Sequence, residues 1–313
     1  MNYIETLYDG ENITETYFCK DKIVATSSKN GKTYYSLKLQ DRTGVIDGKI
    51  WELSNAIEHF EAMDFIKISG QVISFNNTLQ LNIRQVRRAQ EGTYDIADYM
   101  PVSPFKIDDM YAELLGIIDS IKDTHLKALL DEFFRNDTDF IKLFKKSSAA
   151  KSMHHAFMGG LLQHTLSVTK IADNLATLYP IINRDLLLTA AICHDIGKVK
   201  EISPFPENDY TDEGNLVGHI VMGSMMIKEK ASKIDGMSQE MITNLVHCIL
   251  SHHGKLEYGS PEKPKIIEAV ALSYADDTDA KLEAFKEAVE EDQSGGKWLQ
   301  YSRMFETPIR KTE

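Results

Sequence analysis

The hydrophobic period of this chain changes partway along its length, and the change limits the folds that the chain can adopt. Between residues 16 and 90, apolar and polar residues alternate in short runs, as they do in strands with one buried face. From Ile107 onward, apolar residues recur at spacings of three and four, for example at Leu114, Ile118 and Ile121, which is typical of amphipathic helices. The sequence therefore predicts a β-rich N-terminal part and a helical C-terminal part.

Five strand-like runs are expected in the N-terminal part. Turn-forming residues, such as Asn30-Gly31 and Asp41-Arg42-Thr43-Gly44, separate some of these runs. Five short strands with a helix between the third and the fourth are typical of the small Greek-key barrel called the OB-fold. The expected strands are Tyr17–Thr26, Tyr34–Leu39, Val45–Trp51, Phe65–Phe75 and Thr78–Val86, and the expected helix is Ser54–Phe60.

The C-terminal part is predicted to be an all-α bundle, because no strand-like alternation interrupts its helical spacing. The segment 91–104 contains two prolines and is interpreted as a linker. We expect an OB-fold nucleic-acid-binding domain over residues 1–95, and a linker with a helical domain over residues 96–313. The main helices are expected at Gly160–Leu178, Arg184–Cys193, Gly218–Ser232, Ser238–Ser251 and Pro264–Asp292.

Charge is distributed unevenly along the chain. The formal net charge is −12, but residues 16–90 carry 11 Lys/Arg against 7 Asp/Glu, so this segment is +4 and the remainder is −16. A mildly basic segment beside an acidic body indicates two separate tasks. No apolar run approaches the roughly 20 residues that span a bilayer, the N-terminus lacks a signal-peptide pattern, and the three cysteines lie far apart. We therefore expect a cytoplasmic protein that does not enter a membrane.

Histidines are concentrated in the helical part, where eight of the ten fall in the range 154–253. The most informative is His194, which ends an apolar helix beside Asp195 and is followed by Gly197 and Lys198. Imidazole and carboxylate groups bind divalent metals such as Mn, Fe, Co or Zn. A carboxylate can also bridge two ions, which one imidazole nitrogen cannot do. The dyad is therefore a candidate metal site.

Further ligand-type residues lie on separate expected helices, in the order His, His-Asp, His, His-His and Asp. This ordered set resembles the HD-domain metal-dependent phosphohydrolases, and its extra histidines resemble their two-metal subgroup. The resemblance implies two divalent cations, with manganese expected and cobalt or iron as alternatives. Within the acidic run 276–279, we expect Asp276 to be the ligand. The implied ligands are His164, His194, Asp195 and Asp276 for one cation, and His219, His252 and His253 for the other, with Asp195 as the bridge.

Three residues of this region are expected to act in catalysis. Asp195 would organise both cations, and Lys198 would reach a phosphate oxygen, with a solvated lysine at a helix end as its alternative. His155 is expected to face the substrate phosphate as a proton or hydrogen-bond donor, with capping of the next helix as its alternative; His154 beside it is interpreted in the same way. A continuous helix would put His155 and His164 on opposite faces, so that the two would not easily bind one metal.

A narrower resemblance rests on how the two parts are combined. A barrel with Asp41–Gly44 leading to Lys49–Trp51, followed by the segments 154–165 and 251–261, is similar to the YhaM family of 3′-to-5′ exoribonucleases over about Thr16 to Lys281. The resemblance implies a metal-dependent enzyme that shortens single-stranded RNA from its 3′ end, with single-stranded DNA as a further substrate.

The barrel is then expected to hold the nucleic acid by base stacking and phosphate contacts. In alternating strands about half of the aromatic side chains belong to the core, so individual assignments stay open. We also expect a homo-oligomer, with C-terminal aromatic residues packing on the body or on a neighbouring subunit. The stacking candidates are Tyr34, Tyr35, Trp51 and Phe75, and the phosphate-binding candidates include Lys49 and Arg84.

Two other functions are compatible with these residues. One is an HD hydrolase that acts on a cyclic or triphosphate nucleotide and uses the barrel for regulation. The other is a nucleic-acid-binding protein that has kept a relic of a metal site, which the complete ligand set argues against.

Overall fold

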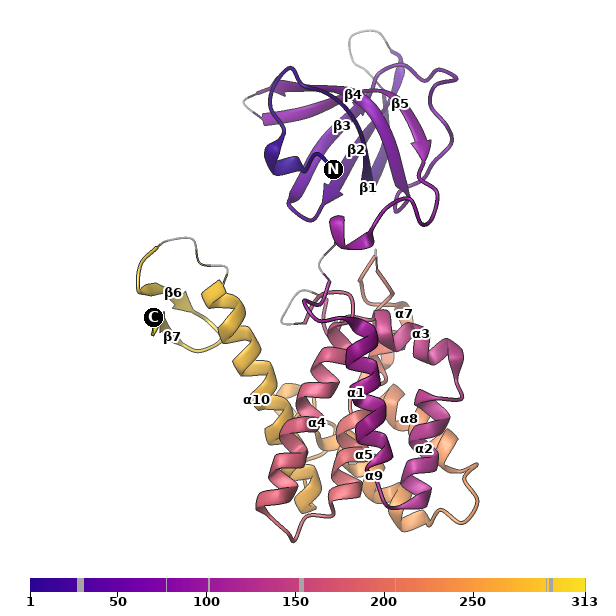
Figure 1. Ribbon diagram of the computed structural model, residues 1–313, viewed down its shortest axis with the longest axis vertical. Coiled ribbons are helices and arrows are strands. Elements are labelled where there is room, and N and C mark those ends of the chain that lie inside the picture. Colours follow the sequence, from indigo (N-terminus) through magenta and orange to yellow (C-terminus); the bar gives the residue numbers. More distant parts are fainter. Residues whose placement is uncertain are drawn as a thin grey trace. The chain divides into compact units, whose positions relative to one another are not determined.

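The computed structural model describes residues 1–26, 31–76, 78–100, 102–151, 155–205, 207–290, 292 and 295–312. The chain forms two compact units, Met1–Pro101 and Val102–Glu313 (Figure 1). His154 and part of the turn expected at Asn30-Gly31 lie outside the described residues.

The first unit is a closed five-stranded barrel. Its strands are β1 (Asn12–Thr26), β2 (Thr33–Asp41), β3 (Gly44–Ile50), β4 (Phe65–Phe75) and β5 (Thr78–Arg88), with 3₁₀ helices at Ile4–Thr6 (η1) and Ile96–Asp98 (η2). The strand order is β1-β2-β3-β5-β4, in which β3 and β5 pair in parallel and the other neighbours are antiparallel. Alternate residues, such as Leu37 and Leu39 of β2, fill the interior with an apolar core. The barrel confirms the OB-fold.

The prediction of a helix at Ser54–Phe60 is wrong. The backbone of this segment pairs with β5 instead, because the Glu58 amide donates to the Val86 carbonyl and the Val86 amide donates to the Ala56 carbonyl. These groups are therefore not used in helical hydrogen bonds. Phe60 is fully buried in the barrel core, which anchors the end of the segment.

The second unit is mostly helical, as expected. Its helices are α1 (Ile107–Asp119), α2 (Thr124–Phe134), α3 (Thr138–Lys146), α4 (Gly160–Leu178), α5 (Arg184–Cys193), α6 (Lys198–Glu201), α7 (Asp212–Val217), α8 (His219–Ala231), α9 (Gln239–Ser251), η3 (Leu256–Tyr258) and α10 (Ile267–Glu290). All residues of α5 from Leu186 to Cys193 are buried, so this helix is enclosed by its neighbours (Figure 1). The residues that follow α5 therefore enter the middle of the bundle.

A close backbone approach fixes the position of those residues. A Cβ atom added to Gly197 would lie 2.0 Å from the carbonyl oxygen of His219, so only glycine lets the turn after α5 approach the start of α8. The glycine thus brings the His194-Asp195 dyad beside His219.

The C-terminal end of the second unit forms a β-hairpin, which was not expected from the sequence. Its strands are β6 (Trp298–Ser302) and β7 (Thr307–Arg310), and it follows the far end of α10 (Figure 1). The hairpin adds to the helical bundle and leaves the expected fold class, a barrel followed by a helical domain, confirmed. Among the described residues, no helix combines the length and the apolar character needed to cross a bilayer.

Candidate metal centre

Side chains from five parts of the helical unit meet at one buried place. His164 lies on α4, Asp276 on α10, and His219 is the first residue of α8, whereas the two adjacent pairs directly follow α5 and α9. Local sequence sets where those helices begin: Asn183 caps α5 by accepting from the Leu186 amide, and Ser238 caps α9 by accepting from the Met241 amide. The pairs that follow are His194-Asp195 and His252-His253.

Asp195 turns its two carboxylate oxygens toward different imidazoles. Its Oδ2 lies 3.3 Å from Nε2 of His194 and 3.5 Å from Nε2 of His164. Its Oδ1 lies 3.4 Å from Nε2 of His219 and 3.7 Å from Nε2 of His252. These distances place Asp195, which is 2% exposed, between two groups of possible ligands.

Each group offers three ligand atoms within 4.8 Å of one another. In the first group, Nε2 of His164 lies 3.2 Å from Oδ1 of Asp276 and 3.1 Å from Nε2 of His194. The second group consists of His219, His252 and His253. The structure thus brings together all seven residues that the sequence analysis proposed as ligands.

Backbone carbonyls orient three of the imidazoles. A carbonyl oxygen only accepts, so the Nδ1 atom that it contacts must carry the proton and Nε2 keeps its lone pair. These contacts join His194 to the Ala191 carbonyl at 2.7 Å, His252 to the Ile249 carbonyl at 2.7 Å, and His253 to the Tyr258 carbonyl at 2.9 Å. The three Nε2 atoms are thereby directed toward the centre.

Carboxylates orient the other two imidazoles. Nδ1 of His219 lies 2.9 Å from Oε1 of Glu201, and Nδ1 of His164 lies 2.7 Å from Oδ2 of Asp279. A carboxylate behind a histidine in this way holds the ring and raises its basicity as a metal ligand. The sequence analysis missed both carboxylates, although Asp279 follows Asp276 by three residues and therefore lies on the same face of α10.

Three buried polar atoms of the centre have no hydrogen-bond partner among the described residues. They are Oδ1 of Asp195, Nε2 of His219 and Nε2 of His252. An unsatisfied buried polar atom is costly, and a bound cation would satisfy these three at once. Nitrogen and oxygen donors of this kind suit a divalent transition metal. The residues present therefore fit such an ion.

Electrostatics favours the charged form of the central carboxylate. Burial alone would raise the pKa of Asp195, but the neighbouring Lys198 and His194 outweigh it and hold that pKa well below its usual value. Burial likewise opposes the charge of Lys198, yet the carboxylate of Asp195, 2.7 Å from Nζ, raises the pKa of Lys198. The site therefore holds a carboxylate anion beside an ammonium group.

His155 lies in the same region, but behind His164. Its ring is 1% exposed, and its Nε2 lies 3.1 Å from Oδ2 of Asp279, the oxygen that also binds His164. His155 and His164 do not belong to one continuous helix, because α4 begins only at Gly160 and the chain before it adopts a left-handed conformation at His155, with φ of 58°. Asp279 thus joins the two imidazoles.

The barrel brings together some of its proposed ligand-binding residues. Inward residues alternate along β2 and β3, so Tyr34, Lys49 and Trp51 share the outer face, where the rings of Tyr34 and Trp51 lie 4.6 Å apart. Tyr35 has the opposite orientation and packs edge-on against Phe60.

The other two barrel candidates are exposed at other places in the same unit. Arg84 lies on β5, whose neighbour is β3, and Phe75 ends β4 with 59% of its surface exposed. The outer surface of the barrel therefore carries both aromatic and basic side chains.

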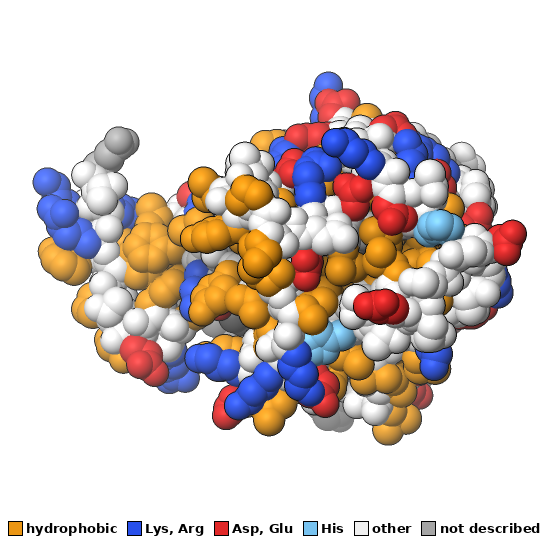
Figure 2. Space-filling view, turned by 90° about the horizontal axis from the view of Figure 1, so that it is seen from below, with side chains coloured by type: hydrophobic (Ala, Val, Ile, Leu, Met, Phe, Trp, Pro, Cys, Tyr) orange, Lys and Arg blue, Asp and Glu red, His pale blue; other side chains and the backbone are white. Residues whose placement is uncertain are grey.

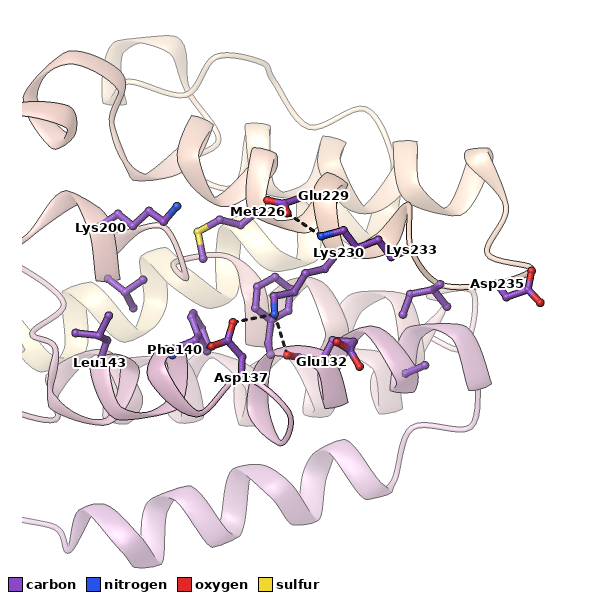
Figure 3. Close-up of a pocket in the computed structure, with 14 residues that line it drawn as sticks. Glu132, Asp137, Phe140, Leu143, Lys200, Met226, Glu229, Lys230, Lys233 and Asp235 are labelled. Atoms are coloured by element: carbon purple, nitrogen blue, oxygen red, sulfur yellow. Dashed lines mark hydrogen bonds and ion pairs between the residues drawn. The ribbon is translucent and has the colours of Figure 1, made fainter.

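A large groove of the helical unit lies apart from the metal centre. It measures about 730 Å³ and runs between α2, α3, α6 and α8 (Figure 3). Its lining includes Phe133 and Met226, and Lys230 donates to Asp137 and to the Glu132 carbonyl. None of the candidate metal ligands lines this groove.

Comparisons with known proteins agree with the two-part organisation. The family model described as an HD domain matches residues 161–281, and the model described as an OB-fold nucleic acid binding domain matches residues 20–89. The chain is 35% identical to the 3′-5′ exoribonuclease YhaM of Geobacillus sp. (strain WCH70) over 290 residues, which cover 91% of this chain and 87% of that protein.

Two solved structures resemble the barrel. One is the second OB-fold domain of replication protein A from Methanococcus maripaludis, with 22% identity, coverage of 29% of this chain and 96% of that domain, and a TM-score of 0.23. The other is a replication protein A heterotrimer bound to single-stranded DNA, with 15% identity, coverage of 28% and 64%, and a TM-score of 0.22.

Proposed function

This chain belongs to the YhaM family of 3′-to-5′ exoribonucleases, and we propose that it shortens single-stranded RNA with two divalent cations held by its histidine–aspartate centre. The observation that carries the two-cation assignment is the orientation of Asp195. Each of its oxygens faces a different group of imidazoles, which is the arrangement that a bridging carboxylate requires.

The proposed ligands divide at Asp195. His164, His194 and Asp276 would hold one cation with Oδ2 of Asp195, and the three histidines of the second group would hold the other with Oδ1. We propose manganese as the physiological metal, with cobalt or iron as alternatives, since mixed nitrogen and oxygen donors suit all three. Two such cations would supply Lewis-acid stabilisation of a phosphodiester and would lower the pKa of a bound water.

Lys198 is proposed to contact the substrate. Its Nζ lies 2.7 Å from Oδ2 of Asp195, and 16% of its side chain is exposed. The ammonium therefore fixes the orientation of Asp195 while keeping donors for a phosphate oxygen.

We propose positioning roles for His155, Asp279 and Glu201. The burial of His155 against Asp279 supports such a role for it better than direct contact with the phosphate. Asp279 would hold the ring of His164, and Glu201 would hold the ring of His219, in the orientation in which Nε2 faces the cation.

The barrel is proposed to bind the single strand. Tyr34 and Trp51 would stack on bases, Lys49 and Arg84 would contact phosphates, and the exposed Phe75 would extend the stacking surface. We propose single-stranded DNA as a second, weaker substrate, because stacking and phosphate contacts do not distinguish the two sugars.

The test is a cleavage assay on 5′-labelled single-stranded RNA with metal-depleted protein to which Mn²⁺ is returned. The expected product is a ladder that shortens from the 3′ end and requires the metal. A cyclic dinucleotide and a deoxynucleoside triphosphate are assayed beside it. If either small nucleotide is hydrolysed while the RNA stays uncleaved, the chain is a small-nucleotide hydrolase and not an exoribonuclease.

We also propose that copies of the chain associate. Large apolar side chains are exposed on the α4–α5 connection and on the first half of α10, and the Asn183 amide joins these segments by donating to Glu268. Figure 2 shows apolar side chains gathered on the face seen from below. Light scattering should give a multiple of the 35.4 kDa chain mass. The exposed residues are Leu178, Tyr179, Ile181, Ile267, Val270 and Tyr274.

A cytoplasmic location is proposed as well. All three cysteines are buried free thiols, and burial raises the pKa of the Cys193 thiol, which suits a reducing compartment.

A further inference from the structure

The β6–β7 hairpin places two aromatic side chains on one face by means of an irregular register. Trp298 is paired with Arg310 and Tyr301 with Pro308, so three steps along β6 match two steps along β7. Directly paired residues share a face, as do residues two apart in one strand. The extra residue of this bulge therefore turns Tyr301 to the same face as Trp298 and Arg310. We call these three residues the hairpin outer face.

The opposite side of the hairpin is held against the helical unit. Ile309 alternates with Pro308 and Arg310 and is 2% exposed. In the connection between the two strands, the ring of Phe305 lies 5.3 Å from the ring of Phe285 on α10. An isolated two-stranded sheet is marginally stable in water, so these contacts anchor the hairpin on the end of α10. The hairpin outer face is therefore exposed to solvent.

Aromatic area and positive charge coincide on this outer face. Trp298 is 62% exposed and Tyr301 is 61% exposed, and the guanidinium carbon of Arg310 lies 5.9 Å from the centre of the Trp298 ring. Residues 295–312 carry four Lys/Arg against one Glu, which is +3 in a chain whose net charge is −12. Lys311 pairs with Asp292, whereas Lys297 and Arg303 are exposed. In Figure 2 the arm on the left shows apolar and basic side chains together.

A cavity beside the outer face has room for a nucleobase. It measures about 420 Å³ and is lined by Ala288 of α10, by Asp292, whose carboxylate pairs with Lys311, and by hairpin residues that include Trp298, Tyr301 and Ile309. Exposed aromatic rings beside cationic side chains are the combination with which proteins hold single-stranded nucleic acid without reading its sequence.

We propose that the hairpin outer face binds single-stranded RNA, as a second RNA-binding surface besides the barrel. The proposal rests on the exoribonuclease function proposed above. Because α10 carries Asp279 and ends 11 residues later at Glu290, a rise of 1.5 Å per residue puts about 16 Å of helix between the metal centre and the hairpin. A strand held on the outer face is thus within a few nucleotides of the centre. The surface would retain long RNA between successive cleavage steps.

A second copy of the chain is a less suitable partner for this face. In a two-fold contact the same patch meets itself, so Arg310 and the neighbouring basic residues of one copy would face those of the other. These like charges repel each other, whereas RNA phosphates carry the complementary charge.

The test compares RNA binding by full-length variants in the presence of EDTA, so that no turnover occurs. Trp298→Ala with Tyr301→Ala is expected to weaken the binding of a fluorescein-labelled 30-nucleotide RNA by about tenfold or more in anisotropy titrations. Arg310→Gln is expected to lower the slope of log affinity against log salt by about one unit. Phe105→Ala is the matched control, because Phe105 is an exposed aromatic residue at 57% just before α1 and belongs to none of the proposed binding surfaces.

Each outcome separates this proposal from its rivals. Unchanged affinity and salt slope in the hairpin variants would overturn it, and so would a change of molar mass by light scattering with unchanged RNA affinity, which would assign the face to a contact between copies. If the circular dichroism spectrum shows that the double variant is unfolded, the salt slope of Arg310→Gln alone decides whether the hairpin outer face binds RNA. Turnover of a trinucleotide should stay at the wild-type rate in all variants. Wild-type protein that cleaves no RNA would refute the exoribonuclease function, while the binding data would still decide the role of the hairpin.

Discussion

Oδ1 of Asp195 lies 3.4 Å from Nε2 of His219, and neither atom has a hydrogen-bond partner in the described part of the chain. The imidazole is turned to this position by Glu201, which accepts from its Nδ1 atom. Two buried acceptors that face each other without a proton between them create a place for a cation. This relationship underlies the predictions for the metal centre.

Asp195→Ala is expected to abolish RNA hydrolysis and to leave RNA binding intact. The carboxylate joins the two ligand groups, whereas the affinity for RNA comes from other surfaces. Cleavage is followed on labelled RNA with Mn²⁺, and binding is followed in EDTA. Asp277→Ala is the matched control, since Asp277 pairs with Lys281 on the surface of α10. Turnover above about a tenth of the wild-type rate would contradict the bridging role.

His219→Ala is expected to remove one of the two cations. The metal content after dialysis against Mn²⁺, measured by elemental analysis, should fall from two ions per chain to one. Hydrolysis should be nearly as weak as in Asp195→Ala. His59→Ala should change neither value, because 83% of the His59 side chain is exposed. Mild loss of activity with unchanged metal content would mean that the chain uses a single cation.

Glu201→Ala is expected to weaken metal binding without removing a ligand. With its carboxylate gone, the ring of His219 is free to rotate, and loss of such a partner typically costs about 10–100-fold in metal affinity. Activity should therefore return as the Mn²⁺ concentration is raised, which distinguishes a positioning residue from a ligand. Glu201→Gln keeps an acceptor oxygen and should recover part of the affinity. Equal loss in both variants at saturating metal would refute the positioning role.

Gly197→Ala is expected to destabilise the helical unit by about 1–3 kcal/mol. Its new Cβ would lie 2.0 Å from the His219 carbonyl oxygen, so α8 must move away from Asp195. Thermal unfolding measures the effect. Gly116→Ala on α1 is the matched substitution, because nothing lies within 4 Å of a Cβ there, and it should stabilise by about 0.5–1 kcal/mol. A similar unfolding temperature for both variants would contradict the close approach.

RNA with a stable internal hairpin should be shortened only up to the base of its stem. Asp195 is 2% exposed and His252 is 1% exposed, so a phosphate must enter a narrow site, which a flexible single strand can do and a duplex cannot. A time course on labelled RNA should show products that accumulate at the stem. Internal cuts, or equal rates through stem and single strand, would contradict entry from a free end.

Several elements could be predicted with their bounds because their own residues carry the signal. β4, α4 and α5 begin and end where the sequence predicted, since the apolar spacing, the turns and the caps are all local. The helix expected at Ser54–Phe60 failed because the backbone of that segment pairs with β5, which is distant in sequence. The C-terminal hairpin was not predicted because a contact with Phe285 of α10, which is distant in sequence, helps to hold it, whereas its own residues show no clear alternation.

The sequence alone determined the order of a small barrel and a helical domain, and it indicated which histidines and aspartates are able to bind metal. These properties depend on residue type and spacing along one element. Only the tertiary structure decided which oxygen of Asp195 faces which imidazole, that Glu201 and Asp279 stand behind His219 and His164, and that His155 approaches Asp279. The physical reason is that these atoms come from separate segments, so their distances depend on how the helices pack and on how closely the backbone at Gly197 approaches α8.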